Sequence, residues 1–256
     1  MNKQTYILSI AGFDPSNGAG IASDVKTFEA HGLYGLSVCT ALTVQNDMTF
    51  QSCKWVDIDL ILDQIHILFD RFMIDVVKIG IVENWQVLSQ ILDELLRLNP
   101  NIKMVLDPVL KSSTGFDFHE KSSQQKFESI LNKCYIITPN FEEIQALYPD
   151  KTVEETIKII SDKTNLYLKG GHRTDNKGRD ELYRKDYNKV LFEPKLTDIY
   201  PKHGSGCVLA SAIASNLTLH ADLIDACRHA KWYTEQFLNS TKTLLGTHSK
   251  TNSHAS

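Results

Sequence analysis

The stretch YILSIAGFDPSNGAGIASDVKTFEAHGLYGLSVCTALTV, residues 6–44, contains one complete strand–helix–strand unit. Tyr6–Ile10 and Leu36–Val44 are apolar runs typical of strands, and in Ile21–His31 the apolar residues recur at helical spacing. Two strands joined by a helix-length segment pair in parallel through a right-handed crossover. This unit therefore predicts a parallel sheet.

The same alternation continues along the chain. Further strand-like runs are expected at Val76–Ile79, Met104–Leu106, Tyr135–Thr138 and Leu166–Lys169. Helices are expected at Asp57–Phe72, Trp85–Leu98, Lys126–Cys134, Val153–Lys163, Cys207–Leu219 and Ala221–Ser240. Asp180–Phe192 breaks this rhythm and predicts an antiparallel edge hairpin that turns at Asp186–Asn188. The fold class is thus α/β, a mostly parallel sheet with helices on both faces.

Composition limits the classes of function. The chain has 256 residues, 42% of them hydrophobic, so we expect a single domain over residues 1–246 and a fraying polar tail over 247–256. A net charge of −4 without a basic block argues against nucleic acid as a partner. The first apolar stretch is too short for a signal peptide or a membrane span, so we expect a cytoplasmic protein. Five cysteines without a CxxC pair indicate neither a disulfide framework nor a zinc site.

Polar residues gather in the loops that follow the predicted strands. In open parallel sheets, ligands bind at the carboxyl ends of the strands. The loops there carry Asp14, Gln45, Asn46, Asp47, Gly80, Asp107, Pro108, Asn140, Glu143 and Lys169–His172. This edge of the sheet is the predicted site.

Two glycine-rich loops compete for the role of phosphate loop. AGFDPSNGAG, residues 11–20, has neither the lysine of a Walker A loop nor the spacing of a dinucleotide loop. HGSGC, residues 203–207, leads directly into a helix, where free backbone N–H groups and the helix dipole favour an anion. Glycines also serve ordinary loops, but we interpret the second loop as the anion site.

The motifs together resemble a known family. SIAGFDPSNGAGIASD, KIGIV, VLDPV, ITPNFEE, LKGGH and HGSGC follow one another in the order found in the hydroxymethylpyrimidine/phosphomethylpyrimidine kinases of thiamine biosynthesis, members of the ribokinase superfamily. The resemblance spans nearly all of the chain up to the tail. It implies a ribokinase-like three-layer fold, a homodimer, and phosphoryl transfer from ATP with Mg²⁺. The implied acceptors are a small heterocyclic alcohol, 4-amino-5-hydroxymethyl-2-methylpyrimidine, and then its monophosphate.

The resemblance also implies which residues bind the heterocycle. They are Gly12, Asp24, Val44, Gln45, Gly80, Ile81 and Val109. Asp24 can accept a hydrogen bond from a ring amino group, and the Gln45 amide can both donate and accept. Each also has a structural alternative, because acidic residues favour the start of a helix and Gln45 can hold a turn.

On the nucleotide side, the resemblance implies an anion hole and a magnesium site. Gly204, Ser205, Gly206, Asn140 and Lys169 would contact ATP phosphates, while Glu143 and Asp107 would hold Mg²⁺, partly through water. The structural alternatives are a solvated helix-face carboxylate for Glu143 and an ordinary strand-end lysine for Lys169.

Cys207 is the implied catalytic residue, where many ribokinase relatives carry an aspartate base. A helix N-terminus lowers the pKa of a thiol and bound phosphate raises it, so Cys207 is expected to be a modest base. In the second step a neutral thiol would repel the phosphate nucleophile less than a carboxylate would.

Several residues depart from the family pattern. Phe13 replaces a small residue, Asn17 a glycine, Ile81 a methionine and Ser205 a threonine, and residues 200–202 also differ. These changes affect the shape of the pocket, so two alternatives stay open: a vitamin B6 kinase of the same fold, and a non-catalytic nucleotide- or pyrimidine-binding regulator.

Overall fold

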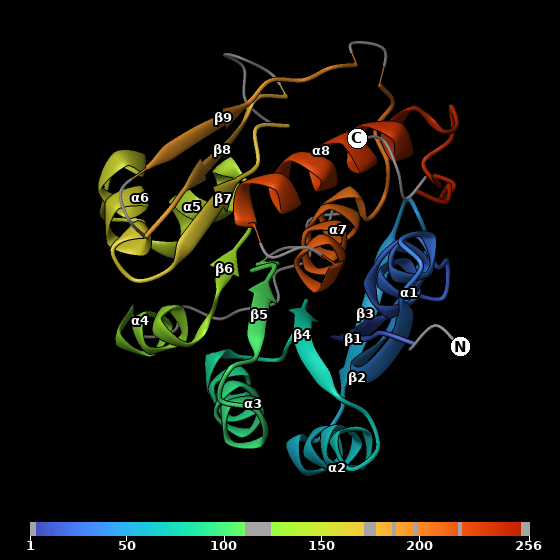
Figure 1. The fold of residues 1–256 in the computed structure, drawn as a ribbon, viewed down its shortest axis with the longest axis vertical. Coiled ribbons are helices and arrows are strands. Elements are labelled where there is room, and N and C mark those ends of the chain that lie inside the picture. Colours follow the sequence, from blue (N-terminus) through green and yellow to red (C-terminus); the bar gives the residue numbers. More distant parts are fainter. Residues whose placement is uncertain are drawn as a thin grey trace.

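A computed structural model describes residues 4–110, 124–171, 178–185, 188–196, 199–219 and 222–251. Its strands are β1 (Tyr6–Phe13), β2 (Tyr34–Gln45), β3 (Phe50–Trp55), β4 (Ile74–Ile79), β5 (Lys103–Leu106), β6 (Ile136–Ile137), β7 (Asn165–Leu168), β8 (Asp180–Tyr183) and β9 (Lys189–Phe192). They form one sheet in the order β3-β2-β1-β4-β5-β6-β7-β8-β9 (Figure 1). Strands β2 to β7 in this order are parallel, while β3, β8 and β9 run antiparallel to their neighbours.

Helices cover both faces of the sheet. They are α1 (Gly20–Ala30), α2 (Ile58–Phe69), α3 (Trp85–Leu98), α4 (Gln124–Lys133), α5 (Phe141–Leu147), α6 (Val153–Ser161), α7 (Ser205–Leu219) and α8 (Leu223–Asn239). One apolar core lies between the sheet and α2 to α6, and a second lies under α1, α7 and α8. Helix α7 lies between α8 and the central strands (Figure 1), so its side chains are buried almost all round. The predicted three-layer α/β fold is confirmed.

Local signals explain where the elements begin and end. Helix α3 has the predicted bounds because the Asn84 side chain accepts hydrogen bonds from the Gln86 and Val87 N–H groups at its start, and Pro100 follows its last turn. The edge hairpin of β8 and β9 is also confirmed. Its turn residues Asp186 and Tyr187, and Ala221 at the predicted start of the last helix, lie outside the described residues.

Two elements were not predicted. Strand β3, FQSCKW, pairs antiparallel with β2 at the other edge of the sheet, where its half-exposed side chains leave little apolar pattern to detect. Helix α5 is short, and its start is marked by a capping box in which Asn140 and Glu143 hydrogen-bond to each other's backbone N–H. The predicted parallel core of the sheet is nevertheless confirmed.

The expectation of a fraying tail is wrong for residues 247–251. The Thr251 N–H donates to the Ala30 carbonyl oxygen at 2.9 Å, which is an orphan acceptor at the end of α1. The His248 ring lies 4.8 Å from the Phe237 ring, and its Nδ1 lies 3.0 Å from the Tyr233 hydroxyl. The tail is thus held across α1 and α8, and residues 252–256 lie outside the described part. In the described chain, none of the helices is both long and apolar enough to span a bilayer.

Candidate active site

The two glycine-rich loops touch each other. Gly204 has a φ of +76°, and a Cβ added there would overlap the Gly18 carbonyl oxygen. A Cβ on Gly18 would in turn lie 2.6 Å from the His203 ring and 2.8 Å from Leu245. Only glycine allows this approach of the two backbones. The loop after β1 and the loop before α7 therefore form one surface, although they are far apart in the sequence.

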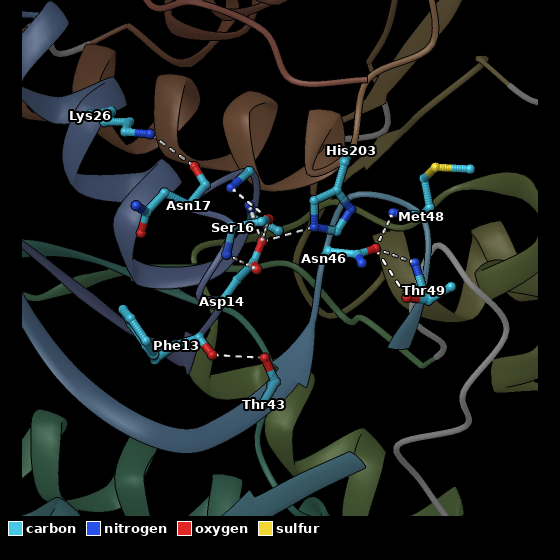
Figure 2. Close-up of polar contacts among 12 residues, drawn as sticks. Phe13, Asp14, Ser16, Asn17, Lys26, Thr43, Asn46, Met48, Thr49 and His203 are labelled. Carbon is cyan, nitrogen blue, oxygen red and sulfur yellow. Dashed lines mark hydrogen bonds and ion pairs between the residues drawn. The ribbon is translucent and has the colours of Figure 1, made fainter. Parts of the chain in front are cut away.

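A buried hydrogen bond joins these loops. Asp14 Oδ2 lies 2.9 Å from His203 Nε2 and accepts from the Ala19 N–H, while Oδ1 accepts from the Ser16 N–H (Figure 2). Burial raises the pKa of Asp14, but the hydrogen bonds from His203, Ser16 and Ala19 outweigh it and hold the pKa below its ordinary value. Asp14 is therefore a charged residue that fixes the turn. The sequence indicated a polar loop there but not this pairing with His203.

Five of the predicted heterocycle residues, Gly12, Val44, Gln45, Gly80 and Ile81, lie at or just after the ends of β1, β2 and β4. A Cβ on Gly12 would lie 2.5 Å from Ile81, and one on Gly80 would lie 3.1 Å from Ala11. Val44 is 53% exposed near the end of β2. The structure thus brings Gly12, Gly80 and Ile81 into one group.

The turn role, which was the structural alternative for Gln45, belongs to its neighbour. Asn46 Oδ1 accepts from the Met48 and Thr49 N–H groups in the turn between β2 and β3 (Figure 2). The Gln45 amide makes no hydrogen bond within the described residues. Val109 follows Asp107, and its N–H donates to the Asp107 carbonyl oxygen at 2.8 Å. Gln45 thus keeps its amide available at the end of β2.

Asp24 is engaged by protein donors in the structure, and its predicted contact with the heterocycle stays a prediction. Its side chain is fully buried, and four hydrogen bonds occupy its carboxylate, with donors Ser9, Ser211 and the Lys78 ammonium, which binds both oxygens. A carboxylate has about four acceptor positions, and these four hydrogen bonds use them. The Asp24 carboxylate lies 2.8 Å from Lys78 Nζ. It is the counter-ion that makes burial of this lysine possible. Lys78 interrupts an apolar strand, and this was the signal in the sequence for a buried partner.

On the other side of the site, three charged side chains meet. Lys169 Nζ lies 2.9 Å from Asp107 Oδ1 and 3.6 Å from Glu143 Oε2. Asp107 also accepts a hydrogen bond from the Thr138 hydroxyl at 3.1 Å. Burial opposes the charge on Lys169, but the two carboxylates outweigh it and raise the pKa of Lys169. The structure therefore unites the predicted phosphate lysine with both predicted magnesium ligands.

The capping box holds Glu143 in place. Its Oε2 accepts from the Asn140 N–H at 2.7 Å, and its own N–H donates to Asn140 Oδ1 at 2.8 Å. Glu143 is thus buried at the start of α5 and is not a solvated helix-face carboxylate. Burial raises the pKa of Glu143, Lys169 lowers it and Asp107 raises it, with a net rise. Asn140 acts here as a helix cap as well as a neighbour of the lysine.

The two carboxylates suit a magnesium ion bound mainly through water and phosphate. Asp107 Oδ2 accepts no hydrogen bond within the described residues, and the same holds for Glu143 Oε1. A Cβ on Gly206 would lie 3.3 Å from Lys169 Nζ and 3.7 Å from Asp107 Oδ2, so the missing side chain keeps this space open. The described chain holds no group of three or more residues able to bind a metal by themselves. Mg²⁺ commonly uses one or two carboxylates and completes its shell with water and phosphate oxygens.

Cys207 lies in the first turn of α7 between the two sides of the site. The Gly20 N–H donates to its sulfur, and Lys78, Asp24 and Asp107 are close enough to act on its charge. Burial raises the pKa of the Cys207 thiol to about 11, with Lys78 opposing the rise. The thiol is therefore neutral near pH 7, and the expected lowering by the helix dipole does not prevail.

This combination of motifs and geometry has a counterpart among known proteins. Residues 14–252 match the family described as phosphomethylpyrimidine kinase. The chain belongs to this family. It is 36% identical over 248 residues to the hydroxymethylpyrimidine/phosphomethylpyrimidine kinase of Aquifex aeolicus, a match that covers 92% of this chain and 95% of that protein.

Solved structures agree with this assignment. A phosphomethylpyrimidine kinase from Clostridium difficile is 31% identical and superimposes with a TM-score of 0.75, covering 90% of this chain and 98% of that chain. A pyridoxal kinase from Staphylococcus aureus in complex with AMP-PCP gives a TM-score of 0.84 at 20% identity, covering 98% and 96% of the two chains. The pyridoxal kinase shares the fold.

The structure explains one departure from the phosphomethylpyrimidine kinase pattern. Asn17 has a φ of +58°, in the left-handed region where glycine is usual and asparagine is among the best-tolerated other residues. Its carbonyl oxygen accepts a hydrogen bond from Lys26 at 3.0 Å (Figure 2). Asn17 therefore preserves the turn. Phe13, by contrast, is 41% exposed next to Gly12, and nothing in the structure explains its size.

Proposed function

We propose that this protein uses ATP and Mg²⁺ to phosphorylate 4-amino-5-hydroxymethyl-2-methylpyrimidine and then its monophosphate. The observation that carries the proposal is the meeting of Lys169, Asp107 and Glu143 beside Gly206 at the start of α7. This arrangement offers a cation, two carboxylates and backbone N–H groups to a polyphosphate. It rests on the chain's membership of the phosphomethylpyrimidine kinase family.

Each side of the site has a distinct task in this proposal. Gly204 and Gly206 would present N–H groups to the transferred phosphate, Ser205 lies between them with its N–H donating to the Lys202 carbonyl oxygen, and Lys169 balances the phosphate charge. Asp107 and Glu143 would hold Mg²⁺, which neutralises phosphate charge during transfer. Gly12, Gly80, Ile81, Val44, Gln45 and Val109 form the acceptor side. The Asp14–His203 pair keeps the two sides together.

Cys207 acts as a neutral group close to the acceptor oxygen. Phosphoryl transfer through a loose transition state depends mainly on positioning and on charge stabilisation, so a strong base is not needed. A thiol with a pKa of about 11 brings no negative charge to the site. This suits the second reaction, in which the nucleophile is itself a phosphate oxygen.

The position of Asp24 changes how substrates are distinguished. A partner for Asp24 was the expected reason to prefer an aminopyrimidine over pyridoxal, but the Asp24 carboxylate is already occupied. The preference for the pyrimidine therefore rests on the family membership and on the available Gln45 amide.

One experiment tests the function. The purified protein is incubated with Mg-ATP and, separately, the hydroxymethylpyrimidine, its monophosphate and pyridoxal, while ADP and product masses are followed. We expect ADP formation with both pyrimidines and a product heavier by one phosphate in each case. Turnover of pyridoxal alone would overturn the proposal, and so would the absence of ADP with all three acceptors.

The state of assembly and the location belong to the same proposal. The resemblance implies a homodimer in the cytoplasm, and both stay predictions. Sedimentation equilibrium of the purified chain, of mass 28.9 kDa, should give about twice that mass if the dimer forms.

A further inference from the structure

A buried polar network lies behind Lys169, between the sheet and α8. Asp180 Oδ2 accepts from the Tyr167 hydroxyl at 2.8 Å and from Lys231 Nζ at 3.0 Å. Glu235 Oε1 lies 3.3 Å from the same ammonium group. All four side chains are buried, and none belongs to the site described above.

This network holds the two chain segments on either side of residues 171–177. The Gly170 N–H donates to Asp180 Oδ1 at 2.7 Å, and the Gly178 N–H donates to the Gly170 carbonyl oxygen at 3.1 Å. Lys231 Nζ donates to the Gly178 carbonyl oxygen at 2.6 Å. A Cβ on Gly170 would overlap the Arg179 backbone, so the two segments are in direct contact. Residues 170 and 178–180 are therefore tied to one another and to Lys231.

Gly170 follows directly after Lys169, so this unit also sets the position of the lysine backbone. The Lys169 N–H donates to the Pro139 carbonyl oxygen at 2.9 Å on one side, and Gly170 is held by Asp180 on the other. The Lys169 side chain reaches Asp107 and Glu143 from this backbone. A shift of Gly170 would therefore move Nζ relative to both carboxylates.

The energetics of the network point to positioning and not to stability. Burying an ion pair costs about as much in desolvation as it gains, and a well-packed apolar group is often as stable. Two hydrogen bonds and an ion pair nevertheless fix the Lys231 ammonium. Such a fully partnered group defines one geometry, because any displacement leaves buried charge without partners.

We propose that Lys231, on α8, is a positioning residue that sets the place of Lys169 through Asp180 and Gly170, and so tunes the binding of ATP phosphates. The inference rests on the proposed function for its nucleotide. It assigns a task to a residue that makes no contact with Lys169 in the structure.

The test compares two variants that each remove one donor to Asp180. Lys231→Met also removes the bond to Gly178, whereas Tyr167→Phe leaves the ties of Gly170 and Gly178 in place. We expect Lys231→Met to raise the KM for ATP and the Kd of a non-hydrolysable ATP analogue about tenfold, because small misplacement of a phosphate-binding group is costly. The KM for the pyrimidine should change less than twofold, and Tyr167→Phe should leave all three constants within twofold.

A purely structural role gives a different result. Both variants would then lower the unfolding midpoint and leave the KM and Kd for nucleotide unchanged, which would overturn the inference. Lys231→Gln, which stays polar, takes the place of Lys231→Met if that variant does not fold, and the same increase in Kd is expected. Calorimetric titration of the analogue needs no turnover. If the unmodified protein bound the analogue but phosphorylated no pyrimidine, the proposed function would be wrong. The same titration of the variants would still decide the inference about Lys231.

Discussion

At the scale of single residues, the charge around Cys207 determines what this position can do. Asp24 and Asp107 raise the pKa of the thiol and Lys78 lowers it, while burial favours the neutral form above all. A carboxylate at the same position would place a third negative charge beside Asp24 and Asp107. The neutral thiol avoids this repulsion when the acceptor carries a phosphate.

This argument predicts the effect of Cys207→Asp. The ratio of kcat/KM for the pyrimidine monophosphate to that for the free alcohol should fall about tenfold, because a fixed charge near the nucleophile repels only the phosphorylated acceptor. The two rates are measured separately by product mass. Cys207→Ser, an uncharged control, should keep the ratio near that of the parent. An unchanged ratio in Cys207→Asp would show that charge at this position does not discriminate between the steps.

At the scale of elements, the capping box of α5 serves both the fold and the site. Asn140 and Glu143 satisfy each other's backbone N–H groups and at the same time place the Glu143 carboxylate beside Lys169. Either residue can be changed so that one task is lost and the other is kept. The helix start thus offers a way to separate stability from activity.

We expect Glu143→Gln to keep the cap, because an amide oxygen can still accept from the Asn140 N–H, while the charge for Mg²⁺ is lost. Its free energy of unfolding should stay within about 0.5 kcal/mol of the parent. The value of kcat/KM at limiting Mg²⁺ should fall about 10- to 100-fold. Asn140→Ala, the matched variant, should lose about 1 kcal/mol in urea unfolding. Equal losses of stability in both variants would contradict this separation of tasks.

The sequence predicted elements best where one face is apolar and the ends are capped. Helix α3 shows this, since its buried residues recur at helical spacing and Asn84 and Pro100 mark its limits. Strand β3 was not predicted because this edge strand is half exposed and lacks a clear alternation of apolar and polar residues. Its pairing with β2 depends on tertiary contact.

The sequence also predicted part of the candidate site. Lys169, Asp107, Glu143 and Gly206 do meet, because each follows a strand or begins a helix at the same edge of the sheet. The partners of Asp24 were not predicted, because Lys78 and Ser211, which bury its carboxylate, lie 54 and 187 positions away in the sequence. Local sequence holds no information on contacts of that range.

At the scale of the whole molecule, the C-terminal segment closes the structure around the two loops. The Leu244 carbonyl oxygen accepts from the His203 N–H at 2.9 Å, and Leu245 lies against Gly18. Further along, His248 lies against Phe237 and Tyr233 on α8, with its Nδ1 3.4 Å from the Thr27 hydroxyl on α1. The segment therefore links the loops of the site to two helices of one layer.

This closure should make stability depend on pH. Burial lowers the pKa of His248 to about 4, with Lys26 and His31 adding to the effect. Its pKa in the unfolded chain is near 6.5, so the unfolded state binds more protons below that pH. The neutral ring stabilises the fold fully above pH 6.5, and this contribution is lost as the pH falls toward 4. After allowance for solvent screening, the loss is on the order of 1 to 2 kcal/mol.

Urea unfolding between pH 7 and pH 4 measures this loss, and His248→Phe is the matched variant because it keeps a ring against Phe237 without a titrating group. The stability of the variant should fall less steeply with pH than that of the parent, so the difference between the two curves should change by the amount above. Buried His31, whose pKa is also lowered by burial, still titrates in both proteins, so the difference removes its own contribution and keeps only its coupling to His248. Curves that stay parallel from pH 7 to pH 4 would show that protonation of His248 does not oppose the docking of the C-terminal segment.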